Sequence, residues 1–168
     1  LTFDDPDDKR VLCISFTESV ADRRVTWDRY VDDSPDQAVV VDVAAELRAG
    51  DSSGRSPADR APDTSFDPAV DRVTSPEDLT TLGVRISYRL DDWLPPSPDH
   101  QVVVCFESIS TLLQYADTRR THKFLAALTD RFATADTIAH FHMDPTAHDE
   151  TTTAPLTPLF DAVCEPDG

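Results

Sequence analysis

The chain has 168 residues, which is the size of one domain with a substantial core. Asp and Glu together number 32 against 15 Lys and Arg, so the formal net charge is −17. Such a surface repels nucleic-acid phosphates and anionic lipids, and no run of about 18 apolar residues is present to span a bilayer. We therefore expect no nucleic-acid and no membrane partner. The first ten residues lack the regions of a signal peptide, which predicts a cytoplasmic protein, and Leu1 in place of Met leaves an N-terminal truncation open.

The charged residues are unusual in kind as well as in number. Of the acids 26 are Asp and 6 are Glu, and of the bases 13 are Arg and 2 are Lys. Asp holds a compact hydrated carboxylate near the backbone, whereas Lys adds a long apolar stem that is a disadvantage in concentrated salt. In molar salt the Debye length falls to about 3 Å, so this density of like charge does not drive the fold apart. The composition indicates a cytoplasmic protein of a salt-accumulating halophile, such as a haloarchaeon. Its acidity is then an adaptation to the solvent.

The first half of the chain contains two short apolar runs with a helix between them. Residues 11–16 (VLCISF) and 38–43 (AVVVDV) are typical of parallel strands that are covered on both faces. Ser19 predicts the start of a helix that continues to about residue 31. Residues 45–70 are rich in Pro, Ser and Asp, and we expect a mobile surface loop there rather than a domain boundary. A weak strand is expected at 70–74.

The second half alternates helices and strands. Ser75 and Pro76 predict the start of a helix whose apolar side chains form one stripe: Leu79, Leu82, Ile86, Leu90 and Trp93. Residues 102–106 (VVVCF) form the strongest predicted strand. The other expected elements are a helix at 118–133, a strand at 137–143, a short polar turn, a helix near 153–160 and a last strand near 161–165.

This alternation predicts an α/β fold over the whole chain, 1–168. We expect a three-layer sandwich with a mostly parallel sheet of five or six strands and right-handed crossovers. Cys13, Cys105 and Cys164 lie far apart, each within an apolar run, so we expect free, buried thiols.

Ligands in such a sheet bind outside the carboxyl ends of the strands, so the residues that follow each strand are the candidates. Glu107-Ser108-Ile109-Ser110 follows one strand, and His142-Met143-Asp144-Pro145 follows another. These two segments, together with the later AHDE and PLFDAV sequences, resemble RecA-like ATPases of the KaiC type. They resemble most a haloarchaeal RecA/KaiC-like group of unknown function, some of whose members are described as halobacterial transducer-like. The resemblance covers residues 75–165 well, and the first strand and helix more loosely.

The resemblance implies a P-loop-type core with two nucleotide-binding motifs. The first strand should lead into a GxxxxGK[ST] loop that cradles phosphate, and a later strand should end in Asp-Ser-Leu-Ser next to Mg²⁺. In this chain the first loop, with Thr17, Glu18 and Ser19, contains neither Gly nor Lys, and Glu107 followed by Ser108 stands at the end of the Walker-B-like strand. We therefore expect a degenerate phosphate loop, no catalytic residues, and no bound ATP or Mg²⁺.

Four residues form a second candidate site: His140, His142, Asp144 and His148. On a strand the first two share a face, and the other two follow on the adjoining turn. Imidazole and carboxylate groups at this spacing can hold Zn²⁺. The alternative is a polar strand end whose histidines hydrogen-bond to neighbouring loops.

The expected function is that of a non-catalytic regulatory or scaffolding RecA/KaiC-like domain. It would act through a protein partner or through self-association, without a cofactor. Two alternatives stay open from the sequence. One is a metal-binding enzyme or sensor that uses His140, His142 and His148, and the other is a nucleotide binder that does not hydrolyse.

Overall fold

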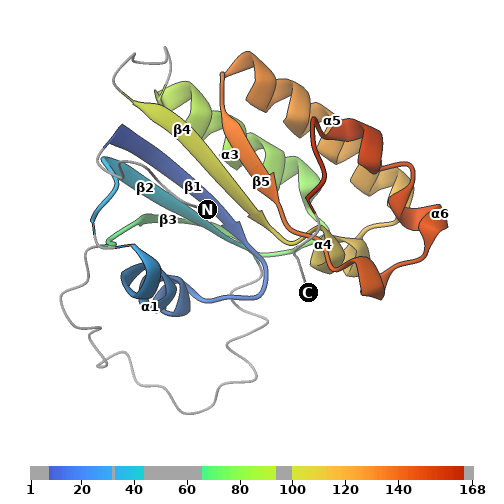
Figure 1. Cartoon of the computed structure of the whole chain (residues 1–168), viewed down its shortest axis with the longest axis horizontal. Helices are drawn as coiled ribbons and strands as arrows, with labels where there is room; N and C mark the ends of the chain where they lie inside the picture. Colours follow the sequence, from blue (N-terminus) through green and yellow to red (C-terminus); the bar gives the residue numbers. More distant parts are fainter. Residues whose placement is uncertain (1–7, 32, 44–65, 94–99, 165–168) are drawn as a thin grey trace.

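The computed structural model of the chain describes residues 8–31, 33–43, 66–93 and 100–164 (Figure 1). The strands in this part are β1 (Lys9–Ser15), β2 (Gln37–Val43), β3 (Ala69–Val73), β4 (Gln101–Glu107) and β5 (Ile138–Phe141). The α-helices are α1 (Val20–Tyr30), α3 (Leu79–Trp93), α4 (Ile109–Tyr115), α5 (Thr118–Thr134) and α6 (Glu150–Thr153), and two short 3-10 turns are η2 (Pro145–Ala147) and η3 (Thr157–Leu159). Among these described helices, none combines the length and the apolar character needed to cross a membrane.

All neighbouring strands of the sheet are parallel, in the order β3-β2-β1-β4-β5. The chain therefore moves outward from β1 through β2 to β3, and then returns across the sheet to place β4 on the other side of β1. This reversal makes the boundary between β1 and β4 a topological switch point, which is where doubly wound α/β sheets bind their ligands.

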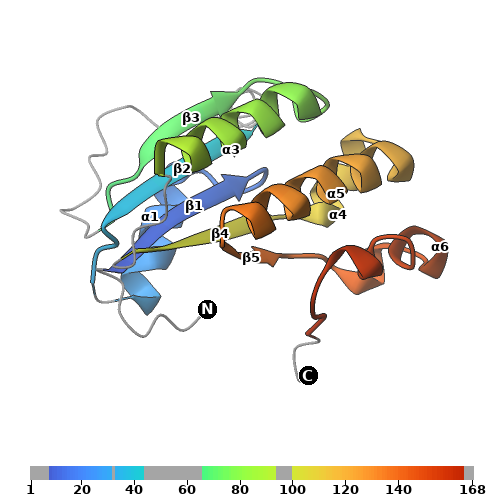
Figure 2. The same cartoon turned by 90° about the horizontal axis from the view of Figure 1, so that it is seen from above.

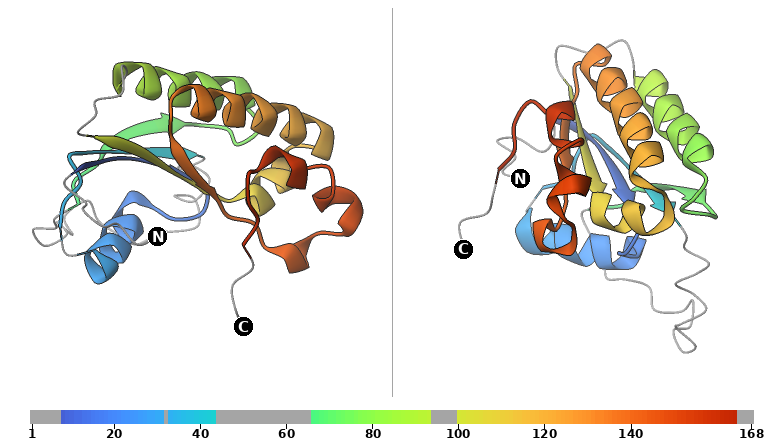
Figure 3. Two further views of the ribbon diagram at one scale, coloured as in Figure 1. Left: turned by 45° about the horizontal axis from the view of Figure 1, so that its top comes forward. Right: turned by 90° about the vertical axis from the view of Figure 1, so that its right-hand side faces the viewer.

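The helices form two layers on opposite faces of the sheet (Figures 2 and 3). Helix α1 lies on one face, and α3 and α5 lie on the other. Alternation along β1 matches this arrangement: Leu12 and Ile14 belong to the core shared with α3 and α5, and Val11 and Cys13 belong to the core shared with α1. The predicted three-layer α/β sandwich with a parallel sheet is confirmed.

The core on the α1 side is small and depends on one aromatic pair. Trp27 of α1 stacks on Phe66, with ring centroids 4.6 Å apart and an interplanar angle of 15°. Phe66 is fully buried, and the pair packs with Val11, Cys13 and Val40 of the sheet. Trp27 is the buried residue of α1, and its large apolar ring anchors the helix on the sheet.

The predicted loop at 45–70 extends too far at its C-terminal end. Residues 45–65 lie outside the described part of the chain, so the prediction of mobility is not tested there. Phe66, however, is a core residue, and β3 begins at Ala69, within the predicted loop. A lone aromatic residue among Pro, Ser and Asp has no periodic neighbours, which is why the sequence pattern does not reveal its burial.

The predicted start of α3 is also displaced. The helix begins at Leu79, and Asp78 rather than Ser75 caps it, because the Asp78 carboxylate accepts a hydrogen bond from the Thr81 N–H at 2.9 Å. Ser75 instead begins the preceding turn, where its carbonyl accepts a hydrogen bond from the Asp78 N–H. The apolar stripe of the helix is as predicted, with Leu82, Ile86, Leu90 and Trp93 buried.

Two elements predicted near the C-terminal end do not form. The helix expected at 153–160 is interrupted, since α6 ends at Thr153 and Pro155 cannot continue the helical hydrogen bonding. Residues 161–164, where a last strand was expected, are exposed and are not part of the sheet, which ends at β5. Residue 165 lies outside the described part. The small apolar residues of this segment resemble a strand in sequence, but residues 161–164 do not pair with any strand of the described sheet.

Candidate functional site

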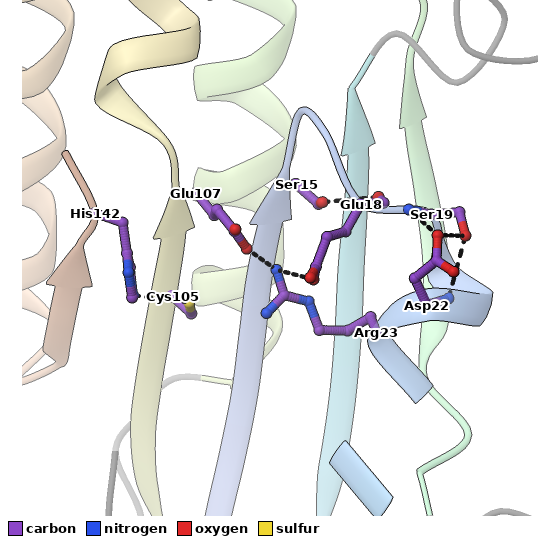
Figure 4. Close-up of polar contacts among 8 residues, drawn as sticks. All are labelled: Ser15, Glu18, Ser19, Asp22, Arg23, Cys105, Glu107 and His142. Carbon is purple, nitrogen blue, oxygen red and sulfur yellow. Dashed lines mark hydrogen bonds and ion pairs between the residues drawn. The ribbon is translucent and has the colours of Figure 1, made fainter. Parts of the chain in front are cut away.

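The carboxyl ends of β1 and β4 lie side by side and form the centre of the candidate site (Figure 4). In the β1–β4 pairing Ser15 is opposite Glu107, and the Phe16 N–H donates to the Glu107 carbonyl at 3.1 Å. Strand β1 continues through a short loop into α1, and β4 continues through Ser108 into α4. This is the switch point of the sheet, so the two segments singled out by the sequence do meet in space.

The N-terminus of α1 is closed by the chain's own side chains. Ser19 is the N-cap: its hydroxyl accepts from the Asp22 N–H at 3.2 Å, and the Asp22 carboxylate accepts from the Ser19 hydroxyl at 2.7 Å. Ser15 is buried, and its hydroxyl donates to the Glu18 carbonyl at 2.8 Å, while Thr17 is exposed. A helix N-terminus attracts anions through its unpaired N–H groups and its dipole. At the N-terminus of α1 the Asp22 carboxylate already occupies the position that an anionic ligand would take.

One guanidinium connects the two strand ends. Arg23, in the first turn of α1, donates a hydrogen bond to the Glu107 carboxylate, and its Nη2 also lies 3.0 Å from an oxygen of Glu18. The Arg23 side chain is only 13% exposed, whereas Glu18 and Glu107 are 33% and 29% exposed. Burial alone would lower the pKa of Arg23, but the neighbouring thiols of Cys13 and Cys105, and after them the carboxylates of Glu107 and Glu18, raise it above its ordinary value. Arg23 is therefore permanently charged and is shared by two carboxylates.

This ion-pair triad, Glu18–Arg23–Glu107, determines what the site can accept. An incoming phosphate would meet two carboxylates and would have to draw Arg23 away from both. Like charges about 4 Å apart repel by about 4 kcal/mol at an effective dielectric constant of 20. Glu107, the residue that the resemblance would place near Mg²⁺, already has a cation from its own chain. The triad thus disfavours both phosphate and its metal.

Two cysteines and a histidine lie beside the triad on the same face of the sheet. Cys13 and Cys105 are opposite each other in the β1–β4 pairing, each two residues before the strand end. Burial raises the pKa of Cys13 to about 12 and also raises that of Cys105. The His142 Nε2 atom is 3.7 Å from the Cys105 sulfur. The prediction of free cysteines is confirmed, and Cys13 is buried, but Cys105 is only partly buried and Cys164 is exposed.

The serines after β4 have structural partners. Ser108 is the N-cap of α4, where its hydroxyl accepts from the Thr111 N–H at 3.1 Å. The Ser110 hydroxyl accepts from the Asp144 N–H at 2.8 Å and so ties α4 to the segment after β5. The peptide bond between Glu107 and Ser108 is cis.

The predicted metal ligands do not assemble into a site. In the described part of the chain no three His, Cys, Asp or Glu side chains lie together in a way that would hold a metal ion. Asp144 caps η2 instead: its carboxylate accepts from the Thr146 hydroxyl at 2.7 Å and from its N–H at 2.9 Å, and these bonds lower its pKa. His142 faces Cys105, and burial lowers the pKa of His140. Asp144 lies within electrostatic reach of His148, but among the described residues these two side chains do not join a third metal-ligating group.

Sequence reasoning identified Glu18 and Glu107 but missed Arg23 as their common partner. Arg24 pairs with Asp67, whereas Arg23 pairs with Glu107, a residue 84 positions away in the chain. No spacing in the sequence indicates this contact, because it depends on the order of the strands.

A search of curated proteins and of solved structures gave no significant match. A protein family described only as a family of unknown function, DUF7504, matches residues 1–166. That match covers nearly the whole length, and the chain therefore belongs to DUF7504.

Proposed function

We propose that this protein is a non-catalytic regulatory or scaffolding domain that acts through contacts with another protein, and that it neither hydrolyses nor binds a nucleotide. The observation that carries the proposal is the Glu18–Arg23–Glu107 triad at the switch point of the sheet. In a nucleotide-binding relative of this fold, that position would receive phosphate. In this protein the side chains of the triad occupy that position.

The first loop supports the same conclusion from a separate set of contacts. It has no Gly that would let the backbone wrap around a phosphate, and no Lys that would reach a terminal phosphate. The capping box at the start of α1 engages two of the backbone donors there, the N–H groups of Ser19 and Asp22. Within the proposal, the RecA/KaiC-like resemblance describes an ATPase shape that has lost its phosphate site.

Protein contacts are supported by apolar side chains that the described fold leaves in solvent. Val84 and Tyr88, one turn apart on α3, are 62% and 64% exposed, and on α1 Val25 and Tyr30 are 54% and 77% exposed. Tyr is enriched at protein interfaces because it combines a large apolar ring with a hydrogen-bonding hydroxyl. We propose that the partner is either a second copy of this chain or an active RecA-like ATPase.

The proposed setting is the cytoplasm of a salt-accumulating haloarchaeon. It rests on the excess of Asp over Glu and of Arg over Lys, and on the net charge of −17. In that setting the acidic surface keeps the protein hydrated in concentrated salt and does not itself select a partner.

Sedimentation equilibrium in molar KCl, over a wide range of protein concentration, tests the proposal together with affinity capture from a haloarchaeal lysate. We expect either concentration-dependent self-association or recovery of one ATPase in a defined ratio. The Tyr88→Ala variant should weaken that association. The matched control is Tyr115→Ala on α4, where the side chain is 38% exposed. A strictly monomeric protein that captures no partner would contradict the proposed role.

A further inference from the structure

Cys13 and Cys105 form a pair of facing thiols in the centre of the sheet. They are directly opposite in the β1–β4 register and lie on the face that carries α1. Neighbouring strands are about 4.8 Å apart, which lies within the range of about 4.4–6.8 Å that disulfides span between Cα atoms. The pair therefore meets the first geometric requirement for a disulfide.

The two thiols differ in access. Cys13 is 3% exposed, whereas Cys105 is partly exposed and contacts His142 at the side of the sheet where β5 lies (Figure 4). An oxidant from solvent therefore reaches Cys105 first, with Cys13 immediately behind it. The order of access is that of an oxidisable thiol backed by a resolving thiol. Because burial raises the pKa of both thiols, little thiolate is present at neutral pH and the reaction with peroxide should be slow.

We propose that Cys13 and Cys105 are a redox-sensitive dithiol that closes to an intramolecular disulfide when the protein meets hydrogen peroxide. In the first step the Cys105 sulfur attacks one peroxide oxygen. The O–O bond breaks, a sulfenic acid forms on Cys105, and the thiol proton joins the leaving hydroxide as water. In the second step the Cys13 sulfur attacks the Cys105 sulfur, the S–O bond breaks, and the hydroxide leaves with the Cys13 proton as a second water. The two cysteines lose two electrons and the peroxide gains them.

Ser15 and Glu107 lie two residues further along the same strands, so a bond between Cys13 and Cys105 would cross-link β1 and β4 next to the triad. The inference is independent of the proposed function.

The test begins from a Cys164→Ser protein, which removes the exposed thiol and with it the easiest route to intermolecular disulfides. The folded protein in molar KCl is treated with hydrogen peroxide, quenched with iodoacetamide and measured by intact mass and peptide mapping. We expect the loss of two hydrogen atoms, a linked peptide pair that contains Cys13 and Cys105, and full reversal by dithiothreitol. Adding Cys13→Ser to this protein should abolish the loss of mass and leave Cys105 oxidised alone.

Three results would overturn the inference. They are sulfinic acid on Cys105 without a linked pair, alkylation of both cysteines after peroxide, and a disulfide that forms only in urea. Each can be read in the Cys164→Ser protein itself, so the conclusion does not depend on whether the Cys13→Ser variant folds.

Discussion

Replacement of Arg23 by Ala is the sharpest test of how the triad contributes to the fold. The change removes a guanidinium that is 13% exposed and leaves Glu18 and Glu107, each about one third exposed, without their shared cation. The remaining carboxylates then repel each other at the junction of β1, β4 and α1. We therefore expect the variant to be less stable, with the loss located where the two strand ends meet.

The size of the loss follows from the burial of the three groups. Breaking a fully buried ion pair costs about 3–5 kcal/mol, and breaking an exposed one costs about 0–1 kcal/mol. The triad lies between these limits, so we expect Arg23→Ala to lower the free energy of unfolding by about 2–3 kcal/mol. Arg24→Ala is the matched control: it lies on the same helix, and its partner Asp67 is 82% exposed, so the loss should be about 0.5 kcal/mol.

Urea unfolding at a fixed KCl concentration, followed by tryptophan fluorescence and circular dichroism, measures both variants. For a chain of this length, 2–3 kcal/mol corresponds to a fall in Tm of about 4–12 °C. A further Glu107→Gln change should restore part of the loss in the Arg23→Ala background, because it removes one of the two repelling charges. Equal effects of Arg23→Ala and Arg24→Ala, or no rescue by Glu107→Gln, would refute this account of the triad.

Three other predictions concern the fold and its solvent. Phe66→Ala should destabilise the protein by about 3–5 kcal/mol in urea unfolding, because the ring is fully buried against Trp27; a loss below about 1 kcal/mol would contradict that placement. Asp71→Asn should cost about 2 kcal/mol near pH 7, because Arg89 donates two hydrogen bonds to this carboxylate, at 2.6 and 2.8 Å, and they lower its pKa. Since the folded pKa lies below the unfolded value of about 3.9, this contribution is complete above about pH 5 and is lost as the pH falls through the folded pKa. The difference between wild type and variant in urea midpoint should therefore shrink below about pH 4, and a constant difference would exclude the ionised pair as its source. Finally, the net charge of −17 predicts that the urea midpoint rises as KCl is increased from about 0.1 M to about 1 M. Over this range the Debye length falls from about 10 Å to about 3 Å, so the repulsion between the acidic residues is screened. A flat or falling urea midpoint would argue against adaptation to salt.

The strands could be predicted because the sheet is buried on both faces. Residues 11–16, 38–43 and 102–106 are continuous apolar runs, and β1, β2 and β4 include nearly all of them. The edge of the sheet was harder to predict. A few small apolar residues at 161–165 resemble a strand in sequence, but residues 161–164 are exposed. A strand also needs a neighbouring strand to pair with, and the sequence pattern does not supply one.

The candidate site could be predicted only in its parts. The rule that ligands gather at strand ends selects Glu18 and Glu107, because it requires only the position of each strand. The contact of Arg23 with Glu107 requires in addition that β4 return to lie beside β1, and that order is a property of the assembled sheet. The metal hypothesis failed for a similar reason. It assumed that His142, Asp144 and His148 converge, whereas Asp144 uses its carboxylate to cap the next turn.

The most direct test of the central claim is a calorimetric titration of the wild-type protein with ATP and with ADP, in the presence of Mg²⁺ and molar KCl. If the triad and the capped α1 helix fill the phosphate position, neither nucleotide should give heat above dilution at protein concentrations of tens of micromolar. Stoichiometric binding of either nucleotide, abolished by Arg23→Ala, would mean that Arg23 leaves its two glutamates to hold phosphate, and it would contradict the account.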